Sequence, residues 1–297
     1  MRFISIPTDI EDASERPFLN SLSHNLQYSL GILEKVMEKS FKAPLEDVDT
    51  TILALYRRLL SQFDGVCILL DHGSLNAAVV ATRAAFETYV SLMFIFMDGE
   101  EFLKHRAASY FIFYKLAELK EFKDQRVLTR MSKLYSAEEI QQMKNSVNKT
   151  LNKISPFKEA MKKRSELIKF LKNENRKESV QWYSLYPKTE QSIYTLKNLI
   201  NYVDKSENNL NKLYALLSME IHSLNVSNDL EFEGDKVLFN DLRHKENIEN
   251  YDVFRQVRDF LANSTLHIIS RYLYPHYATE FGEFYENDRA ITKSIWD

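Results

Sequence analysis

Cysteine, glycine and proline are all scarce in this chain of 297 residues, which contains one Cys, 6 Gly and 6 Pro. The single Cys67 lies in the apolar run 65–70, and a disulfide within the chain is impossible. We interpret it as a buried structural thiol of a reducing compartment. So few Gly and Pro residues leave little material for the turns of an all-β or nucleotide-cradling fold. Composition alone therefore favours helices.

The sequence also shows no sign of export or of a membrane span. Residues 1–12 carry one basic side chain and reach three acidic ones without a long apolar stretch. We therefore expect no signal peptide and a cytoplasmic location. The segment 77–97 approaches the length of a membrane span, but Arg83 and Glu87 stand in its middle. We interpret it as a buried central helix and expect no membrane partner.

Motifs of the common catalytic loops and metal sites are missing. No pair of His or Cys residues has the spacing of a zinc site, so we expect no metal. The Gly-x-Ser-x-Gly elbow, the phosphate loop of NTPases and the Gly-x-Gly-x-x-Gly fingerprint are absent as well. These absences count against α/β-hydrolases, NTPases and Rossmann enzymes, and we expect no cofactor.

Apolar residues recur at helical spacing through most of the chain. The pattern predicts an all-α fold, a multi-helix bundle in one domain over residues 1–297, with the apolar helix at its centre. The predicted helices span 19–40, 47–71, 74–97, 101–122, 137–153, 156–172, 193–203, 209–224 and 247–272. Residues 225–240 are acidic and irregular, and we expect at most a short hairpin there. We expect the aromatic and acidic tail, 276–297, to pack loosely or to mediate association with a partner protein or a second copy.

Charge is distributed unevenly along the chain. The net charge is -3, yet residues 140–177 hold eleven Lys or Arg against three Asp or Glu. This stretch covers most of a basic helical hairpin, residues 137–172, which we interpret as an insertion in the bundle. Two interpretations stay open: a hairpin with solvated Lys-rich faces, or a surface that binds RNA or another polyanion.

Polar residues spaced four apart form three groups on the predicted helices. The groups are Arg83 with Glu87, Arg106 with Tyr110, and Tyr214 with Ser218 and His222. Because the helix of Arg83 and Glu87 is otherwise uncharged, these two must face each other in the interior or line a cavity. Burying either charge alone would be costly.

These groups resemble the landmarks of a bacterial family called domain of unknown function 5677. The motifs are Arg83-Ala-Ala-Phe-Glu87, Arg106-Ala-Ala-Ser-Tyr110 and Tyr214-x-x-x-Ser218-x-x-x-His222. The resemblance covers residues 55–222. It implies an all-helical fold in which these polar residues form one shared feature, and it brings no known activity with it.

Three interpretations of the polar residues stay open. In a structural network, Arg83 pairs with Glu87, and Ser218 holds the imidazole of His222. In a ligand-sensing site, Arg83 and Arg106 grip a phosphate or carboxylate without turnover. In a catalytic pocket, His222 is the general acid or base, an arginine stabilises phosphate charge and Glu87 orients its neighbours. The candidate catalytic residues are His222, Arg83, Glu87 and Arg106, and the candidate substrate-binding residues are Tyr110, Tyr214 and Ser218.

The catalytic interpretation gives a concrete expectation: a metal-independent phosphodiesterase that acts on RNA or nucleotides in bacterial antiphage or toxin-type defence. By analogy, helical ribonucleases of the HEPN superfamily use an Arg and a His four to six residues apart. Arg271 and His276 have that spacing, but Pro275 interrupts the helix that should carry both. The alternative is a non-catalytic interaction or ligand-sensing module.

Overall fold

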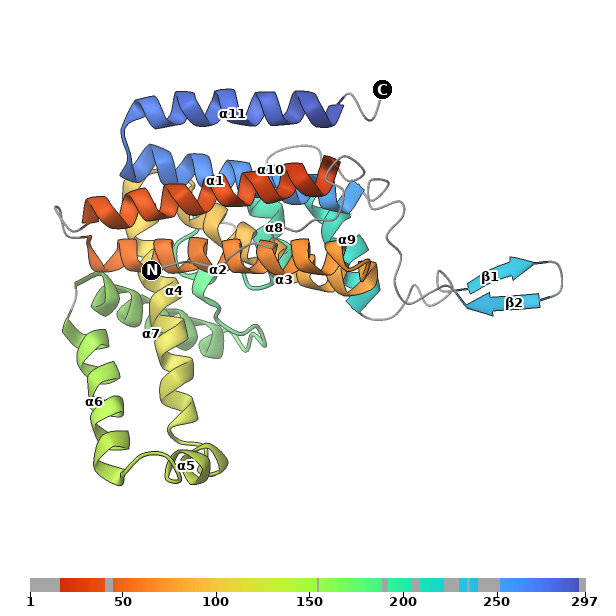
Figure 1. Ribbon diagram of the computed structural model, residues 1–297. Helices are drawn as coiled ribbons and strands as arrows, with labels where there is room; N and C mark the ends of the chain where they lie inside the picture. Colours follow the sequence, from red (N-terminus) through yellow and green to blue (C-terminus); the bar gives the residue numbers. More distant parts are fainter. Residues whose placement is uncertain are drawn as a thin grey trace. The chain divides into compact units, whose positions relative to one another are not determined.

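A computed structural model of the chain describes residues 17–40, 45–153, 155–188, 192–204, 209–221, 230–233, 236–239 and 252–293. Eleven α-helices and one two-stranded hairpin occur in these residues, which confirms the all-α prediction (Figure 1). The helices are α1 (Pro17–Ser40), α2 (Asp47–Asp71), α3 (Leu75–Phe96), α4 (Glu100–Glu121), α5 (Gln125–Met131), α6 (Ala137–Lys153), α7 (Ser155–Asn173), α8 (Leu196–Val203), α9 (Asn209–Ile221), α10 (Asp252–Tyr272) and α11 (Pro275–Lys293). A short 3-10 helix, η2, spans Trp182–Ser184.

The helices fall into two compact units. Unit 1 comprises Met1–Leu45, Leu53–Met93 and Asp204–Asp297, and unit 2 comprises Glu46–Ile52 and Phe94–Val203. The boundary divides two helices, so that each unit contains a part of α2 and a part of α3. The division into one domain with an inserted hairpin stays a prediction.

In unit 1, α1, α10 and α11 run side by side (Figure 1). Buried hydroxyl groups join α1, α2 and α10, because Thr265 Oγ1 lies 2.8 Å from Ser29 Oγ and 2.9 Å from Tyr56 Oη. Burial raises the pKa of the Tyr56 phenol, so it stays protonated as a hydrogen-bonding group. The short hairpin expected near residue 230 is confirmed: β1 (Leu230–Glu233) pairs antiparallel with β2 (Lys236–Phe239).

The expectation that the tail packs loosely was wrong for residues 276–293, and the alternative, that the tail mediates association, stays a prediction. Pro275 begins α11, a place where proline fits because the first helical N–H needs no partner. Tyr28 of α1 stacks on Phe284 of α11 with ring centroids 4.5 Å apart. Asn25 Nδ2 donates to the buried Asp288 carboxylate at 2.7 Å. The tail is therefore a helix that completes the core of unit 1.

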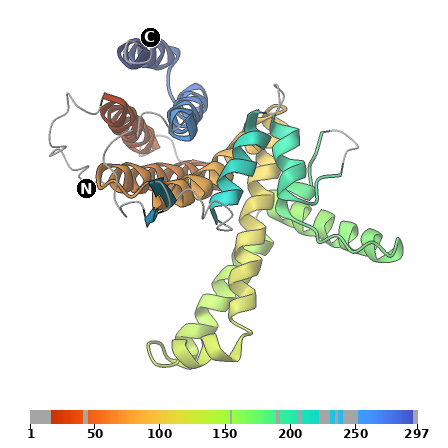
Figure 2. The same cartoon turned by 90° about the vertical axis from the view of Figure 1, so that its right-hand side faces the viewer.

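In unit 2, α4 packs against both α6 and α7. Figure 2 shows α4 and α6 running side by side toward α5, which connects them. The rings of Phe111 and Phe157 stack at 4.6 Å, and the guanidinium of Arg164 lies 5.2 Å from the Phe113 ring. The predicted basic helices thus exist as α6 and α7, and their apolar sides cover α4.

The apolar helix α3 contains Arg83 in its middle. Among the described helices, α3 has the length and composition to cross a membrane, and 67% of its most apolar stretch is buried within the protein. A largely buried apolar helix is typical of a protein core. The expectation of a central helix therefore agrees with its burial.

Candidate functional site

In unit 1, Arg83 of α3 reaches across to α9. Its side chain is 10% exposed, and Nε donates to Glu87 Oε1 at 2.7 Å. Nη1 donates to the Tyr214 carbonyl oxygen at 3.3 Å and to Ser218 Oγ. The four-residue spacing places Arg83 beside Glu87 within α3, and the contact of α3 with α9 brings Ser218 to Arg83.

The aromatic ring of Tyr214 supports the guanidinium from one side. The centre of the Arg83 guanidinium lies 3.7 Å from the ring centroid, a close cation–π contact. Ser218 Oγ donates in turn to the Tyr214 carbonyl oxygen at 2.6 Å, which fixes the hydroxyl as an acceptor for Arg83. Stacking and hydrogen bonding together hold the guanidinium plane in one orientation.

Arg83 still has hydrogen-bonding capacity in this arrangement. A guanidinium carries five N–H donors, and the three on Nε and Nη1 suffice for the contacts to Glu87, Tyr214 and Ser218. The two N–H groups of Nη2 donate to no residue that the structure describes. Two parallel donors on one positive group suit an oxygen of a phosphate or carboxylate.

Glu87 is more exposed than the sequence suggested. Its side chain is 46% exposed, so the pair with Arg83 lies at the edge of the buried region. The carboxylate orients the Nε side of the guanidinium, leaving the Nη2 side for another partner. Glu87 thus fits the expected orienting role, although a side chain 46% exposed does not lie in the interior, one of the two positions expected for it.

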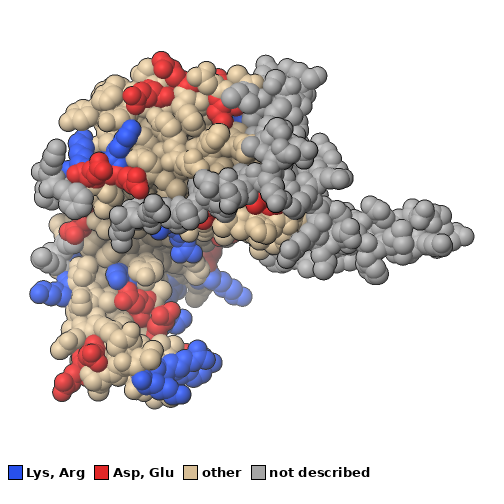
Figure 3. All heavy atoms as spheres, viewed as in Figure 1, with Lys and Arg blue, Asp and Glu red and all other residues tan. Residues whose placement is uncertain are grey.

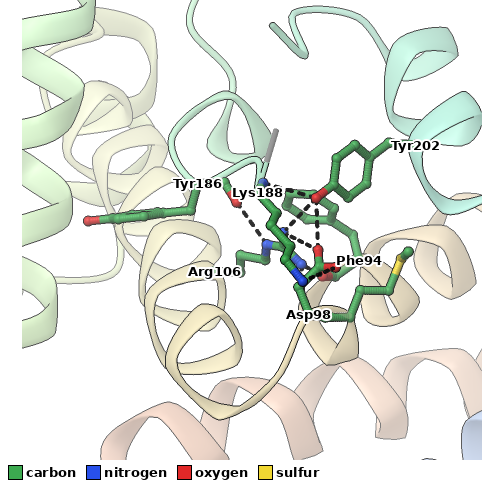
Figure 4. Close-up of polar contacts among 7 residues, drawn as sticks. Phe94, Asp98, Arg106, Tyr186, Lys188 and Tyr202 are labelled. Carbon is green, nitrogen blue, oxygen red and sulfur yellow. Dashed lines mark hydrogen bonds and ion pairs between the residues drawn. The ribbon is translucent and has the colours of Figure 1, made fainter. Parts of the chain in front are cut away.

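In unit 2, Arg106 of α4 is fully buried and saturated (Figure 4). Nε donates to the Tyr186 carbonyl oxygen at 2.9 Å. Nη1 donates to the carbonyl oxygens of Phe94 at 2.7 Å and Met97 at 2.9 Å. Nη2 donates to Asp98 Oδ2 at 2.8 Å and to Tyr202 Oη at 3.2 Å. All five N–H donors are occupied, so none is left for a substrate phosphate.

The partners of Arg106 show what it does in unit 2. Two of them are carbonyl groups at the C-terminal end of α3, which a cation stabilises through hydrogen bonds and the helix dipole. Asp98 has a φ of 71°, a left-handed conformation uncommon outside glycine. Tyr202 Oη also donates to Asp98 Oδ2 at 2.8 Å, and burial is the largest cause that raises the pKa of this phenol. Arg106 therefore closes the turn between α3 and α4.

Comparison with known families bears on these same helices. A family model matches residues 49–237, more than half of the chain. The chain belongs to the family of unknown function DUF5677. No curated protein and no solved structure matches it.

The DUF5677 match covers both arginine networks but adds no activity to them. Every described partner of each arginine lies in the same unit as that arginine, and no described residue is a partner of both. The sequence had grouped Arg83 and Arg106 as one feature. The hydrogen bonds saturate the guanidinium of Arg106, whereas they leave two donors of Arg83 without a partner among the described residues.

Two other predicted site residues of this DUF5677 member have different outcomes. Tyr110 belongs to unit 2, where its ring meets the Trp182 ring edge-on at 5.0 Å. His222 lies outside the described residues, directly after the end of α9. Its proposed acid or base role therefore stays a prediction.

Sequence reasoning missed two partners of Arg106. Neither Asp98 nor Tyr202 was among the candidate site residues. The only signal for Asp98 was an acidic residue beside Gly99, eight positions before an arginine. Nothing in the sequence marks Tyr202, because its contact spans 96 positions.

The Arg–His pair expected from the HEPN analogy does not share a helix. Arg271 lies in the last turn of α10, and His276 is the second residue of α11. The His276 ring instead packs against the Tyr277 ring at 4.2 Å. Within the described residues, no group of three or more His, Cys, Asp or Glu side chains could hold a metal ion.

Proposed function

We propose that this DUF5677 member is a metal-independent phosphodiesterase that acts on RNA or nucleotides, with Arg83 as its phosphate-binding group. The observation that carries this proposal is the partly used guanidinium of Arg83, held by Glu87, Tyr214 and Ser218. An arginine whose guanidinium is held by three residues, while two of its donors meet no described partner, is preorganised for an anion. Because the Arg83 side chain is only 10% exposed, water would screen its attraction for an anion less than at the surface.

The chemistry needs a proton carrier beside the bound phosphate. In cleavage of RNA, the ribose 2′-hydroxyl attacks phosphorus, its proton passes to a base, and the departing 5′-oxygen receives a proton. His222 is the candidate for a proton transfer, because it follows Ser218 by four residues and imidazole exchanges protons near neutral pH. Arg83 would stabilise negative charge on the phosphate oxygens, and Glu87 would orient Arg83. Arg106 is left out of this proposal because its donors are occupied.

The proposal also covers the cellular role of the protein and its partners. By analogy with HEPN ribonucleases, we propose a role in bacterial antiphage or toxin-type defence, in the cytoplasm, with a partner protein or a second copy as associates. RNA would meet the basic residues of 140–177, among which Lys158, Lys169 and Lys172 are exposed. Lys163 contributes less, since its ammonium lies 4.1 Å from the Tyr186 ring and burial lowers its pKa.

A non-catalytic module is the second candidate, and one observation favours it. Arg106, one of the two arginines expected to act on phosphate, makes only structural contacts in unit 2. A site with one arginine can bind a phosphate or carboxylate without cleaving it. In that case Arg83 would sense a ligand and His222 would have a structural role.

The deciding experiment measures cleavage of bulk cellular RNA, with and without divalent metal, together with thermal melting. His222→Ala should lower cleavage about a hundredfold or more while the protein stays folded, because general acid–base catalysis supplies roughly 10² to 10⁴. Arg83→Ala should also lose cleavage. Arg58→Ala, a change at an exposed arginine of α2, is the control and should keep full activity. If wild type turns over no RNA, DNA or nucleotide, the enzyme proposal fails and the non-catalytic module replaces it.

A further inference from the structure

A second basic region lies outside residues 140–177, where α5 joins α4 to α6. Residues 115–135 contain six Lys or Arg and three Asp or Glu. Figure 3 shows Lys and Arg side chains gathered at the lower end of the view, where Figure 1 places α5. Charge alone does not make a binding site, because a basic segment can simply be solvated.

The ion pairs of this region leave part of its charge available. Glu118 accepts from Lys115 at 2.8 Å, and Asp124 accepts from Arg126 at 3.1 Å. Arg130 and Lys133 are both exposed, and neither forms an ion pair or side-chain hydrogen bond with another residue that the structure describes. Their charges are therefore free to meet an external anion.

Helical geometry aligns three of these cations. Arg126, Arg130 and Lys133 follow one another at four and three residues, which places them on one side of α5 and the turn after it. The backbone keeps helical hydrogen bonds past the end of α5, because Lys133 N donates to the Arg130 carbonyl oxygen at 3.2 Å. At 1.5 Å of rise per residue, the row spans about 10 Å.

Exposed apolar side chains follow this row of cations along the chain. Leu134 is 78% exposed and Tyr135 is 41% exposed, directly after Lys133. No ring contact occupies Tyr135 among the described residues. We call Arg126, Arg130, Lys133, Leu134 and Tyr135 together the α5 surface.

Cations beside an open aromatic ring fit single-stranded nucleic acid. The cations follow the phosphate backbone, and a base stacks on the ring with little regard to sequence. An anionic membrane fits less well, because it requires a wide apolar face. Here Leu134 is the only aliphatic side chain of the α5 surface, and Val127, Leu128 and Met131 of α5 are half-buried.

We propose that the α5 surface binds single-stranded nucleic acid, with Arg130 and Lys133 on backbone phosphates and Tyr135 stacked on a base. The choice of RNA as the probe rests on the proposed function. Binding itself does not depend on cleavage, since all these residues lie in unit 2 and the Arg83 network lies in unit 1.

The test measures fluorescence anisotropy of a labelled single-stranded RNA of about 16 nucleotides, the upper site size of common single-strand binders. Full-length Arg130→Glu/Lys133→Glu should bind at least about tenfold more weakly than wild type. The slope of log affinity against log salt should also fall, by about 0.7 for each lost phosphate contact. Tyr135→Ala should weaken binding about tenfold with an unchanged salt slope, because it removes stacking rather than charge.

A charge-matched control separates a site from bulk charge. Arg58→Glu/Lys197→Glu reverses one exposed Arg of α2 and one exposed Lys of α8 and should keep wild-type affinity. An equal loss in this control would overturn the proposal, as would failure of wild type to bind. Stronger binding to vesicles of anionic lipid, with the same dependence on Arg130 and Lys133, would also overturn it.

Two further measurements complete the design. Single-stranded DNA of the same sequence should bind with the same dependence on the α5 surface, because phosphates and base faces are common to both. Cleavage of the same labelled RNA by wild type is measured beside binding, so that the two proposals can fail separately. RNA that is bound through α5 but not cleaved would end the phosphodiesterase proposal and leave this one standing.

Discussion

Replacement of Arg106 by alanine gives the sharpest test of the difference between the two arginines. Arg106 is 0% exposed, and its five N–H groups meet five acceptors in unit 2. Removing it leaves Asp98, with a side chain 8% exposed, without its main counter-ion. The loss should therefore appear in stability.

The structure limits the size of this effect. Breaking a buried ion pair by removing one partner costs roughly 3 to 5 kcal/mol. Asp98 would keep the hydrogen bond from Tyr202 at 2.8 Å and a distant Lys188 at 3.9 Å, which favours the lower end. The carbonyl groups of Phe94, Met97 and Tyr186 would lose a donor but could take up water, adding about 1 kcal/mol in all. We expect a destabilisation of about 4 kcal/mol.

Urea unfolding followed by circular dichroism measures the total loss, and hydrogen exchange locates it. The amides of α4 and of the turn after α3 should lose the most protection, because the lost contacts join these segments. Arg106→Lys should recover only part of the stability, since an ammonium has three donors for five acceptors. An Arg106→Ala protein with an unchanged unfolding midpoint, or with lost RNA binding and full stability, would refute the structural assignment.

Two further predictions concern unit 1. Glu87→Ala should lower the free energy of unfolding by about 1 kcal/mol, because Glu87 is 46% exposed and Arg83 keeps its contacts to Ser218 and Tyr214. A loss above about 3 kcal/mol in urea unfolding would contradict this. Burial lowers the pKa of His267 below its usual 6.5, so the unfolded chain binds a proton that the folded chain does not. Stability should therefore fall as pH drops below about 6.5. His267→Gln should reduce the difference in melting temperature between pH 7 and pH 5. If the variant and wild type show the same difference, His267 is not its source.

Much of the secondary structure follows from the sequence. The predicted ranges for α1 to α4, α6 and α7 lie within two residues of those in the structure, because long amphipathic patterns bounded by breaks define helices locally. The short α5 was missed, since seven residues hold less than two full turns of pattern. The helix α11 was missed because its aromatic and acidic residues hide the apolar stripe that meets Tyr28.

The candidate site was only half determined by the sequence. Spacing placed Arg83 beside Glu87, and Tyr214 on one face with Ser218, because residues four apart in a helix are neighbours. That the two pairs meet is a tertiary fact, made by α3 and α9 packing across 135 positions of sequence.

The sequence by itself determined an all-α fold, the helices that carry the polar residues and which polar residues share a helix face. Only the tertiary structure decided which arginine is open. Arg106 is saturated mainly by carbonyl oxygens at Phe94, Met97 and Tyr186, and every residue type has such a carbonyl. A donor satisfied by backbone leaves no pattern in the sequence. A donor such as Nη2 of Arg83, which meets no partner among the described residues, is recognised only from its surroundings.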